Sequence, residues 1–192
     1  MIAALLLTLL TAGRIEGTIG YAGRAVRQPR IVRTDPGCKQ PLTDPTVTLS
    51  KTGKALANVV VRVAGARASE PPPEPVVIEQ RDCMYAPRVS GAVRGQRVVV
   101  KNSDGTLHNV HAYEGLDAGR TLFNVVQPVG APELDRETKA AGVMRLECDV
   151  HAWMRAYVVF SDSALLAVSD AQGRWGIDVP PGRALVVLLI AQ

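Results

Sequence analysis

The stretch CDVHAWM, residues 148–154, sets a cysteine, a histidine and a methionine three positions apart. It is flanked by VMRLEC (143–148) and RAYVVF (155–160), two short runs rich in β-branched and aromatic side chains. Such runs predict one β-strand that ends at Cys148 and another that begins after Met154. The loop therefore gathers three side chains, each able to bind a soft metal ion, at one end of a β-sheet.

The rest of the chain repeats this pattern of short strands and turns. Strands are expected in RIEGTIGY, NVVVRVAG, PVVIEQ, QRVVVKN and ALVVLLI, with turn formers such as DPG, KTG, SDG and PPG between them. Only residues 132–142 (PELDRETKAAG) could hold a helical turn. Several short strands with regular turn signals predict an all-β fold, either a sandwich or a barrel.

Three kinds of site are compatible with the loop. Zinc prefers Cys, His and carboxylate ligands, so a mixed zinc site would leave Met154 unused. A catalytic Cys148 needs a base and an orienting group, and although His151 could act as the base, no third group is suggested. A type 1 copper site uses two histidines, one cysteine and a weak methionine, which matches the residue types best.

The second histidine of a copper site would be His108, which ends the turn-rich stretch NSDGTLH (102–108) upstream of the loop. His111 lies three positions further along the expected strand, so its side chain points to the opposite face. We therefore expect His111 at the surface or in the second shell of ligands. The predicted metal ligands are His108, Cys148, His151 and Met154.

Residues 148–160 and the preceding VKNSDGTLHNVHAY (100–113) resemble the cupredoxins, and the loop is most similar to plastocyanin- and amicyanin-like blue copper domains. The resemblance covers residues 76–160. It implies a Greek-key β-sandwich with one type 1 copper ion that transfers electrons. It also implies that Asn109 ties the two ligand loops together and donates a backbone N–H toward the cysteine sulfur.

The whole chain also resembles an exported plastocyanin-like group linked to methylamine utilisation. Its GRIEG strand and its DAQGRWGIDVPPG hairpin (170–182), the latter similar to a carboxypeptidase-regulatory β module, imply an additional small β-sandwich built from the N-terminal and C-terminal segments. The expected divisions are a signal peptide at 1–13, an N-terminal β segment at 14–68, a Pro-rich linker at 69–75, the copper domain at 76–160, and a C-terminal β hairpin and strand at 161–192.

The N-terminal residues and the cysteines both indicate the cellular compartment in which the protein resides. The apolar run MIAALLLTLLTAG (1–13) is too short to span a bilayer and resembles a secretory signal, although a buried first strand is the alternative. After cleavage we expect a periplasmic or otherwise exported protein without stable membrane insertion. Three cysteines in such a protein predict one disulfide and one cysteine left over. Since Cys148 stands beside a His and a Met, Cys38 and Cys83 would pair, unless both are reduced and merely buried.

The charge balance is 22 basic against 18 acidic residues without a Lys/Arg block, so no nucleic-acid partner is expected. The leading function is one-electron transfer with a redox protein partner, a dehydrogenase or a c-type cytochrome. The alternatives are a copper storage or delivery protein and a structural β module of the cell envelope. An enzyme is not expected, because four ligands would close the site. Trp153 either packs in the core or contacts the partner.

Overall fold

The computed structural model describes residues 13–24, 26–40, 42–117, 119–137, 142–182 and 184–190. These residues form strands β1 to β16 and no helix, which confirms the all-β prediction. Within them, no helix is long and apolar enough to cross a membrane. Residues 1–12, on which the expected signal peptide falls, lie outside the described part of the chain.

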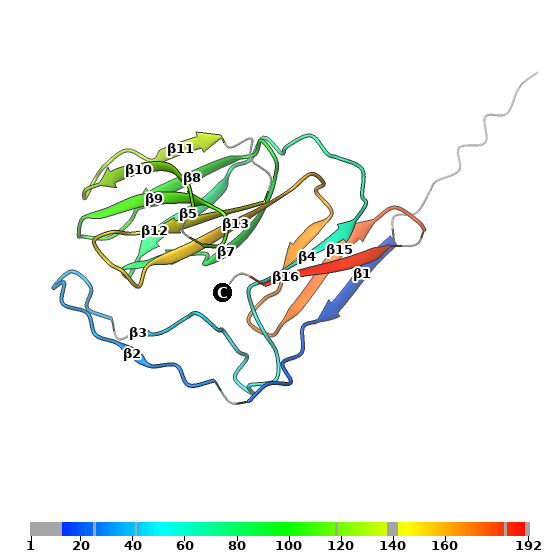
Figure 1. Cartoon of the computed structure of the whole chain (residues 1–192), viewed down its shortest axis with the longest axis horizontal. Coiled ribbons are helices and arrows are strands. Elements are labelled where there is room, and N and C mark those ends of the chain that lie inside the picture. The colour runs from blue at the N-terminus through cyan, green and yellow to red at the C-terminus, as the bar shows by residue number, and fades with distance from the viewer. Residues whose placement is uncertain are drawn as a thin grey trace, which may run out of the picture.

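The larger part of the molecule is a two-layer β-sandwich (Figure 1). One layer has the order β10 (Thr121–Gln127), β9 (His108–Glu114), β12 (Gly142–Glu147), β13 (Arg155–Ser161) and β7 (Val89–Val93). The other has the order β11 (Leu134–Glu137), β8 (Arg97–Asn102), β5 (Val76–Arg81) and β6 (Met84–Ala86). The chain crosses between layers after β10 and after β11, so β12 pairs with β9, its neighbour in space but not in sequence.

Alternating side chains fill the space between these two layers. In β12 the inward positions are Met144 and Leu146, both buried, while the residues between them are partly exposed. β13 is apolar on both faces, as expected of a strand covered on both sides. Its Ala156, Val158 and Phe160 belong to the main core. This core extends to Cys148 and Met154, so the loop between β12 and β13 closes one end of the sandwich.

The N-terminal and C-terminal segments build the second, smaller sandwich that the sequence predicts. One sheet pairs β1 (Gly13–Thr18) with β15 (Arg174–Val179), and the other has the order β14 (Leu166–Val168), β4 (Val59–Ala64) and β16 (Leu185–Ile190). Its own core contains Ile19, Leu56, Val59, Val61, Ile177 and Val179. Each sheet joins strands from both ends of the chain, so neither segment could bury its apolar face alone.

A third apolar cluster joins the two sandwiches. The outer face of β13 contributes Tyr157 and Val159, and β4 contributes Val60. The close approach depends on Gly91 in β7, where a Cβ atom would lie 2.3 Å from Leu166 Cδ1. A larger residue at this position would therefore require the Leu166 side chain to change its conformation.

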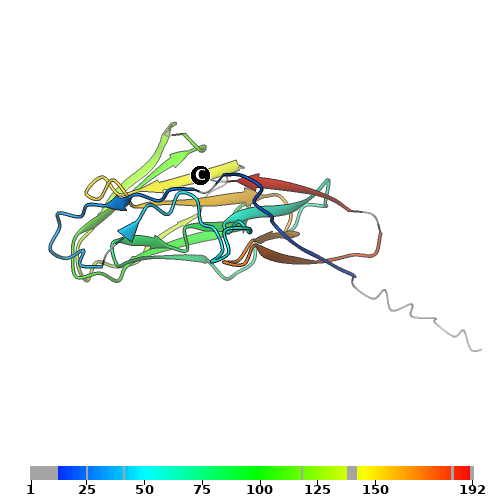
Figure 2. The same ribbon diagram turned by 90° about the horizontal axis from the view of Figure 1, so that it is seen from below.

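Between β1 and β4 the chain makes a long excursion that matters for the site. Figure 1 shows it leaving β1, running beside the larger sandwich toward the β12–β13 loop, and returning to β4. In its described residues the excursion holds the short ladder of β2 (Arg30–Ile31) and β3 (Leu42–Thr43) and two isolated bridges, Gly20 with Ala55 and Leu49 with Leu56. In the second view the same segment lies against the end of the larger sandwich (Figure 2). We call residues 33–38 of this excursion the covering segment.

The helical turn considered for residues 132–142 is wrong where the structure describes it. Residues 134–137 form β11, which pairs antiparallel with β8. Leu134 is buried in the main core opposite Val100, and the three following residues are exposed. The unpaired edge of β8 provides hydrogen-bond partners that the local helical preference cannot match.

Replacing Leu146 with alanine tests the main core. Leu146 is fully buried in β12, so the variant should lose about 2–5 kcal/mol of unfolding free energy, measured by urea denaturation. Leu116→Ala is the matched control, because Leu116 is 45% exposed, and it should change stability by less than about 0.5 kcal/mol. Equal losses in the two variants would contradict the assigned core.

Candidate metal centre

Three of the four predicted ligands meet at the closed end of the larger sandwich. The Nδ1 atoms of His108 and His151 are 2.9 Å apart. Cys148 Sγ lies 3.9 Å from the first and 3.7 Å from the second. All three side chains are buried, with at most 2% exposed. One ion bonded at about 2.0–2.3 Å, the range that zinc takes with His and Cys, needs donors roughly 3–4 Å apart, as these are.

The local fold explains why these side chains converge. His108 begins β9, and Cys148 directly follows β12, the neighbouring strand. The loop that carries His151 is a tight turn, in which Met154 N–H donates to the His151 carbonyl at 2.8 Å. Cys148 N–H in turn donates to the Met154 carbonyl at 3.3 Å, which closes the loop. Met154 is fully buried in the main core on this loop.

Tyr85 of β6 joins the two ligand-bearing strands from the opposite sheet. Its buried hydroxyl lies 2.8 Å from the Asn109 carbonyl and 3.0 Å from the Glu147 carbonyl. Each carbonyl belongs to the residue next to a predicted ligand. Burial, followed by the negative charges of Cys148 and its neighbours, raises the pKa of Tyr85 well above its usual value, so the hydroxyl keeps its proton and donates. No motif in the sequence points to this role of Tyr85.

Asn109 connects the same two strands through its backbone and its side chain. Its backbone N–H donates to Cys148 Sγ at 3.5 Å. Its side-chain oxygen accepts from Asp149 N–H at 2.6 Å, and its amide group donates to Asp149 and Asn124 at 2.9 and 2.8 Å. These bonds set the position of the cysteine relative to β9, and the N–H contact places a hydrogen-bond donor on its sulfur.

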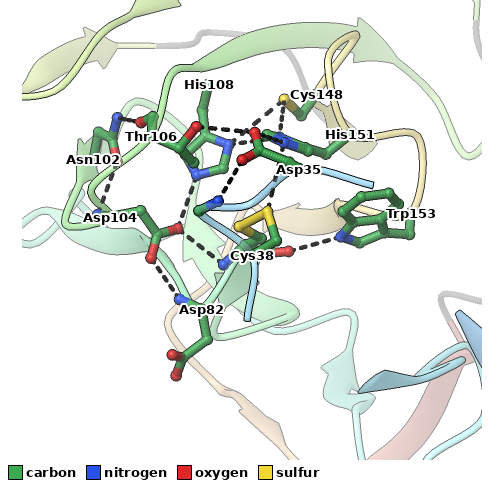
Figure 3. The surroundings of a disulfide bond; sticks show 12 residues. Asp35, Cys38, Asp82, Asn102, Asp104, Thr106, His108, Cys148, His151 and Trp153 are labelled. Carbon is green, nitrogen blue, oxygen red and sulfur yellow. Dashed lines mark hydrogen bonds and ion pairs between the residues drawn. A yellow bond between two sulfur atoms is a disulfide. The ribbon is translucent and has the colours of Figure 1, made fainter. Parts of the chain in front are cut away.

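The outer edges of both imidazoles are bound to carboxylates that the sequence reading did not single out. His108 Nε2 lies 2.8 Å from Asp104 Oδ2. His151 Nε2 lies 2.9 Å from Asp35 Oδ2, across 116 positions of the sequence (Figure 3). Both aspartates occur in turn sequences, SDG and DPG, which are common without any functional role. That is why only the structure reveals them.

These contacts leave a place for a cation between the two rings. A ring that donates its Nε2 proton to a carboxylate presents a lone pair at Nδ1. Two such lone pairs 2.9 Å apart repel unless a proton or a metal ion lies near them. Burial lowers the pKa of His108, while the hydrogen bond that its ring donates to Asp104 acts in the opposite direction. The donor set at this position fits a metal ion.

The predicted disulfide is confirmed, and it lies beside this centre. Cys38 of the covering segment is bonded to Cys83, the residue before β6, and Cys148 is the free cysteine of the described chain. Cys38 Sγ is 3.6 Å from His151 Nε2. The bridge therefore holds the covering segment against the outer edge of His151, as Figure 3 shows.

Trp153 and His111 lie around the centre. The Trp153 indole N–H donates to the Cys83 carbonyl at 2.9 Å, and Arg33 lies over its ring, 5.8 Å from the centroid. The tryptophan is thus half-buried against the disulfide. His111 contacts Asp149 at 3.0 Å and stays outside the three-donor group.

No protein-family model matches this chain, and no curated protein sequence matches it. Similar solved structures include a purple cupredoxin from Nitrosopumilus maritimus, 21% identical over 45% of this chain and 99% of that one, with a TM-score of 0.40. Amicyanin from Paracoccus versutus is 20% identical over 53% of this chain and 97% of its own, also with a TM-score of 0.40. These neighbours are cupredoxins, and they match about half of this chain.

Replacing Asn109 with alanine tests the connection between the ligand strands. The change leaves Asp149 N–H without its acceptor, so the metal-free protein should lose about 1–3 kcal/mol of unfolding free energy, measured by urea denaturation. Asn124→Ala is the control, because its exposed side chain bonds to the same network from the solvent side. A loss no larger than that of the control would show that Asn109 does not hold the strands together.

Proposed function

We propose that this protein is an exported electron carrier that holds one type 1 copper ion between His108, Cys148, His151 and Met154. The observation that carries the proposal is the convergence of two imidazole Nδ1 atoms and one thiol sulfur in a buried pocket. Copper bound there would supply a one-electron couple between Cu(I) and Cu(II). The donor types suit it, since thiolate favours Cu(I) and imidazole accepts both states.

We propose copper and not zinc because the fourth side chain available to the donor set is the thioether of Met154. A structural zinc site takes four Cys, His or carboxylate ligands. Here the two carboxylates nearest the histidines, Asp35 and Asp104, are bound to the outer Nε2 atoms. The remaining side chain on the loop is the thioether of Met154, which is buried and suits copper as a weak ligand.

The surrounding protein is suited to holding the donors still. His108 and Cys148 are attached to paired strands, and the Tyr85 hydroxyl bonds to the backbone of both. A rigid cage that changes little between two oxidation states favours rapid electron exchange. The buried donors leave no open position for a substrate, so we propose no catalytic role.

Export is supported by the disulfide, because such bonds persist in oxidising compartments such as the periplasm. For a partner we propose another redox protein, a dehydrogenase or a c-type cytochrome. Trp153 is a half-exposed aromatic side chain whose ring centroid lies 5.1 Å from that of His151, so we propose that the partner contacts the molecule there. The covered site argues against a delivery protein, which needs metal that exchanges readily.

Copper loading tests the proposal. One equivalent of Cu(II) should give an intense thiolate-to-copper absorption toward the red end of the visible spectrum and a reversible one-electron wave in voltammetry. Cys148→Ser should abolish the absorption, because it removes the thiolate. His111→Gln is the matched control, since it alters the third histidine, which lies outside the donor group, and should retain the absorption. A colourless protein without copper affinity would refute the function.

A further inference from the structure

The covering segment gives the two histidines an environment that their strands alone do not provide. His108 and His151 each have the outer nitrogen on an aspartate. Asp104 comes from the turn just before His108, whereas Asp35 comes from the excursion between the two halves of the small sandwich. Both imidazoles are buried, and buried polar groups need hydrogen-bond partners, which these two carboxylates provide.

Asp35 is itself held by several bonds. Its Oδ1 accepts from the Gly37 N–H at 2.6 Å, and its Oδ2 accepts from the Thr106 hydroxyl at 2.9 Å. The hydrogen bond from Gly37, followed by those from His151 and Thr106, lowers the pKa of Asp35. Gly37 is needed because a Cβ there would lie 2.7 Å from Thr106 Cβ. Asp35 is thus an oriented carboxylate and not a mobile surface group.

Asp104 is held in the same way from the other side. Its two oxygens accept from the backbone N–H groups of Asp82 and Cys83, at 2.7 and 2.9 Å. Those two residues have left-handed φ values of 55° and 54°, which turn both N–H groups toward the carboxylate. Cys83 also carries the disulfide to Cys38. One bridge therefore connects the turn that holds Asp104 with the segment that carries Asp35.

We propose that Asp35 and Asp104 are positioning residues of the metal centre, and that the Cys38–Cys83 bridge keeps Asp35 in place. Each carboxylate holds the imidazole proton at Nε2, so that the Nδ1 lone pair faces the pocket and becomes a stronger donor. The effects on copper affinity and reduction potential rest on the proposed copper function. The tautomer of each ring does not, because it is a property of the metal-free chain.

The negative charges of Asp35 and Asp104 would affect the reduction potential and the affinity of a bound copper ion. A negative charge stabilises Cu(II) more than Cu(I), because Coulomb energy scales with the charge of the ion. The rings that lie between each carboxylate and the Nδ1 atoms are buried, so solvent screens this interaction less than it would at the surface. The carboxylates therefore lower the reduction potential and tighten the binding of Cu(II).

The tautomers are tested without metal. In ¹⁵N-labelled, metal-free protein, nuclear magnetic resonance should find a proton on Nε2 of both His108 and His151. Asp35→Ala should remove this preference at His151 and leave that of His108. A wild-type His151 that carries its proton only on Nδ1 would overturn the proposal, whatever the protein does with copper.

The charge is tested by Asp35→Asn, which keeps an oxygen acceptor but removes the anion. The variant should bind Cu(II) about 10–100-fold more weakly and show a higher reduction potential. Asp44→Asn is the matched control, because Asp44 lies on the same excursion but bonds to Thr46 and not to a histidine. Equal potentials in the two variants would refute the charge effect, while copper binding by the wild type would stand.

The role of the bridge is tested by Cys38→Ser/Cys83→Ser. Without the bridge the covering segment loosens, so the double variant should shift affinity and potential in the same direction as Asp35→Asn. Adding Asp35→Asn to it should then have little further effect, since groups that act through one contact are not additive. Full additivity would show that the bridge does not act through Asp35.

Discussion

The structure depends on a single constraint, which is the burial of two imidazoles and a thiol in one pocket. Polar groups removed from water must find partners, and two Nδ1 atoms 2.9 Å apart cannot satisfy each other as lone pairs. Every outward-facing nitrogen of these rings is bound to a carboxylate, and the cysteine sulfur accepts an N–H from Asn109. The two Nδ1 atoms and the sulfur point inward, toward a common centre.

This constraint gives a physical reason for the unusual course of the chain between its first and fourth strands. The small sandwich needs both ends of the chain, because β1 pairs with β15 and β4 pairs with β16. The segment between β1 and β4 is therefore free to reach the far end of the larger sandwich. There it supplies Asp35 and Cys38, and the disulfide fixes it to the turn before β6.

Much of the fold could be predicted because the relevant signals are local. Runs such as VVVRVA and RAYVVF predict strands, and the structure has β4 and β13 there. The pairing of Cys38 with Cys83 was predicted because Cys148 stands beside a histidine and a methionine, and it is confirmed. Residues 134–137 were considered for a helical turn but form a strand, because pairing with the edge of β8 outweighs their own conformational preference. The roles of Asp35, Asp104 and Tyr85 had no local signal, since aspartate in a turn and tyrosine in a strand are ordinary.

The amino-acid order alone specifies the donor types, because Cys148, His151 and Met154 lie on one loop and need only two flanking strands to be presented together. It also determined that the chain is built from strands, through the periodicity and turn residues of each segment. The residues that cover these donors are apparent only in the folded chain. The contact between Asp35 and His151 joins residues 116 positions apart, and it exists because a disulfide and a carboxylate satisfy groups that the fold has removed from water.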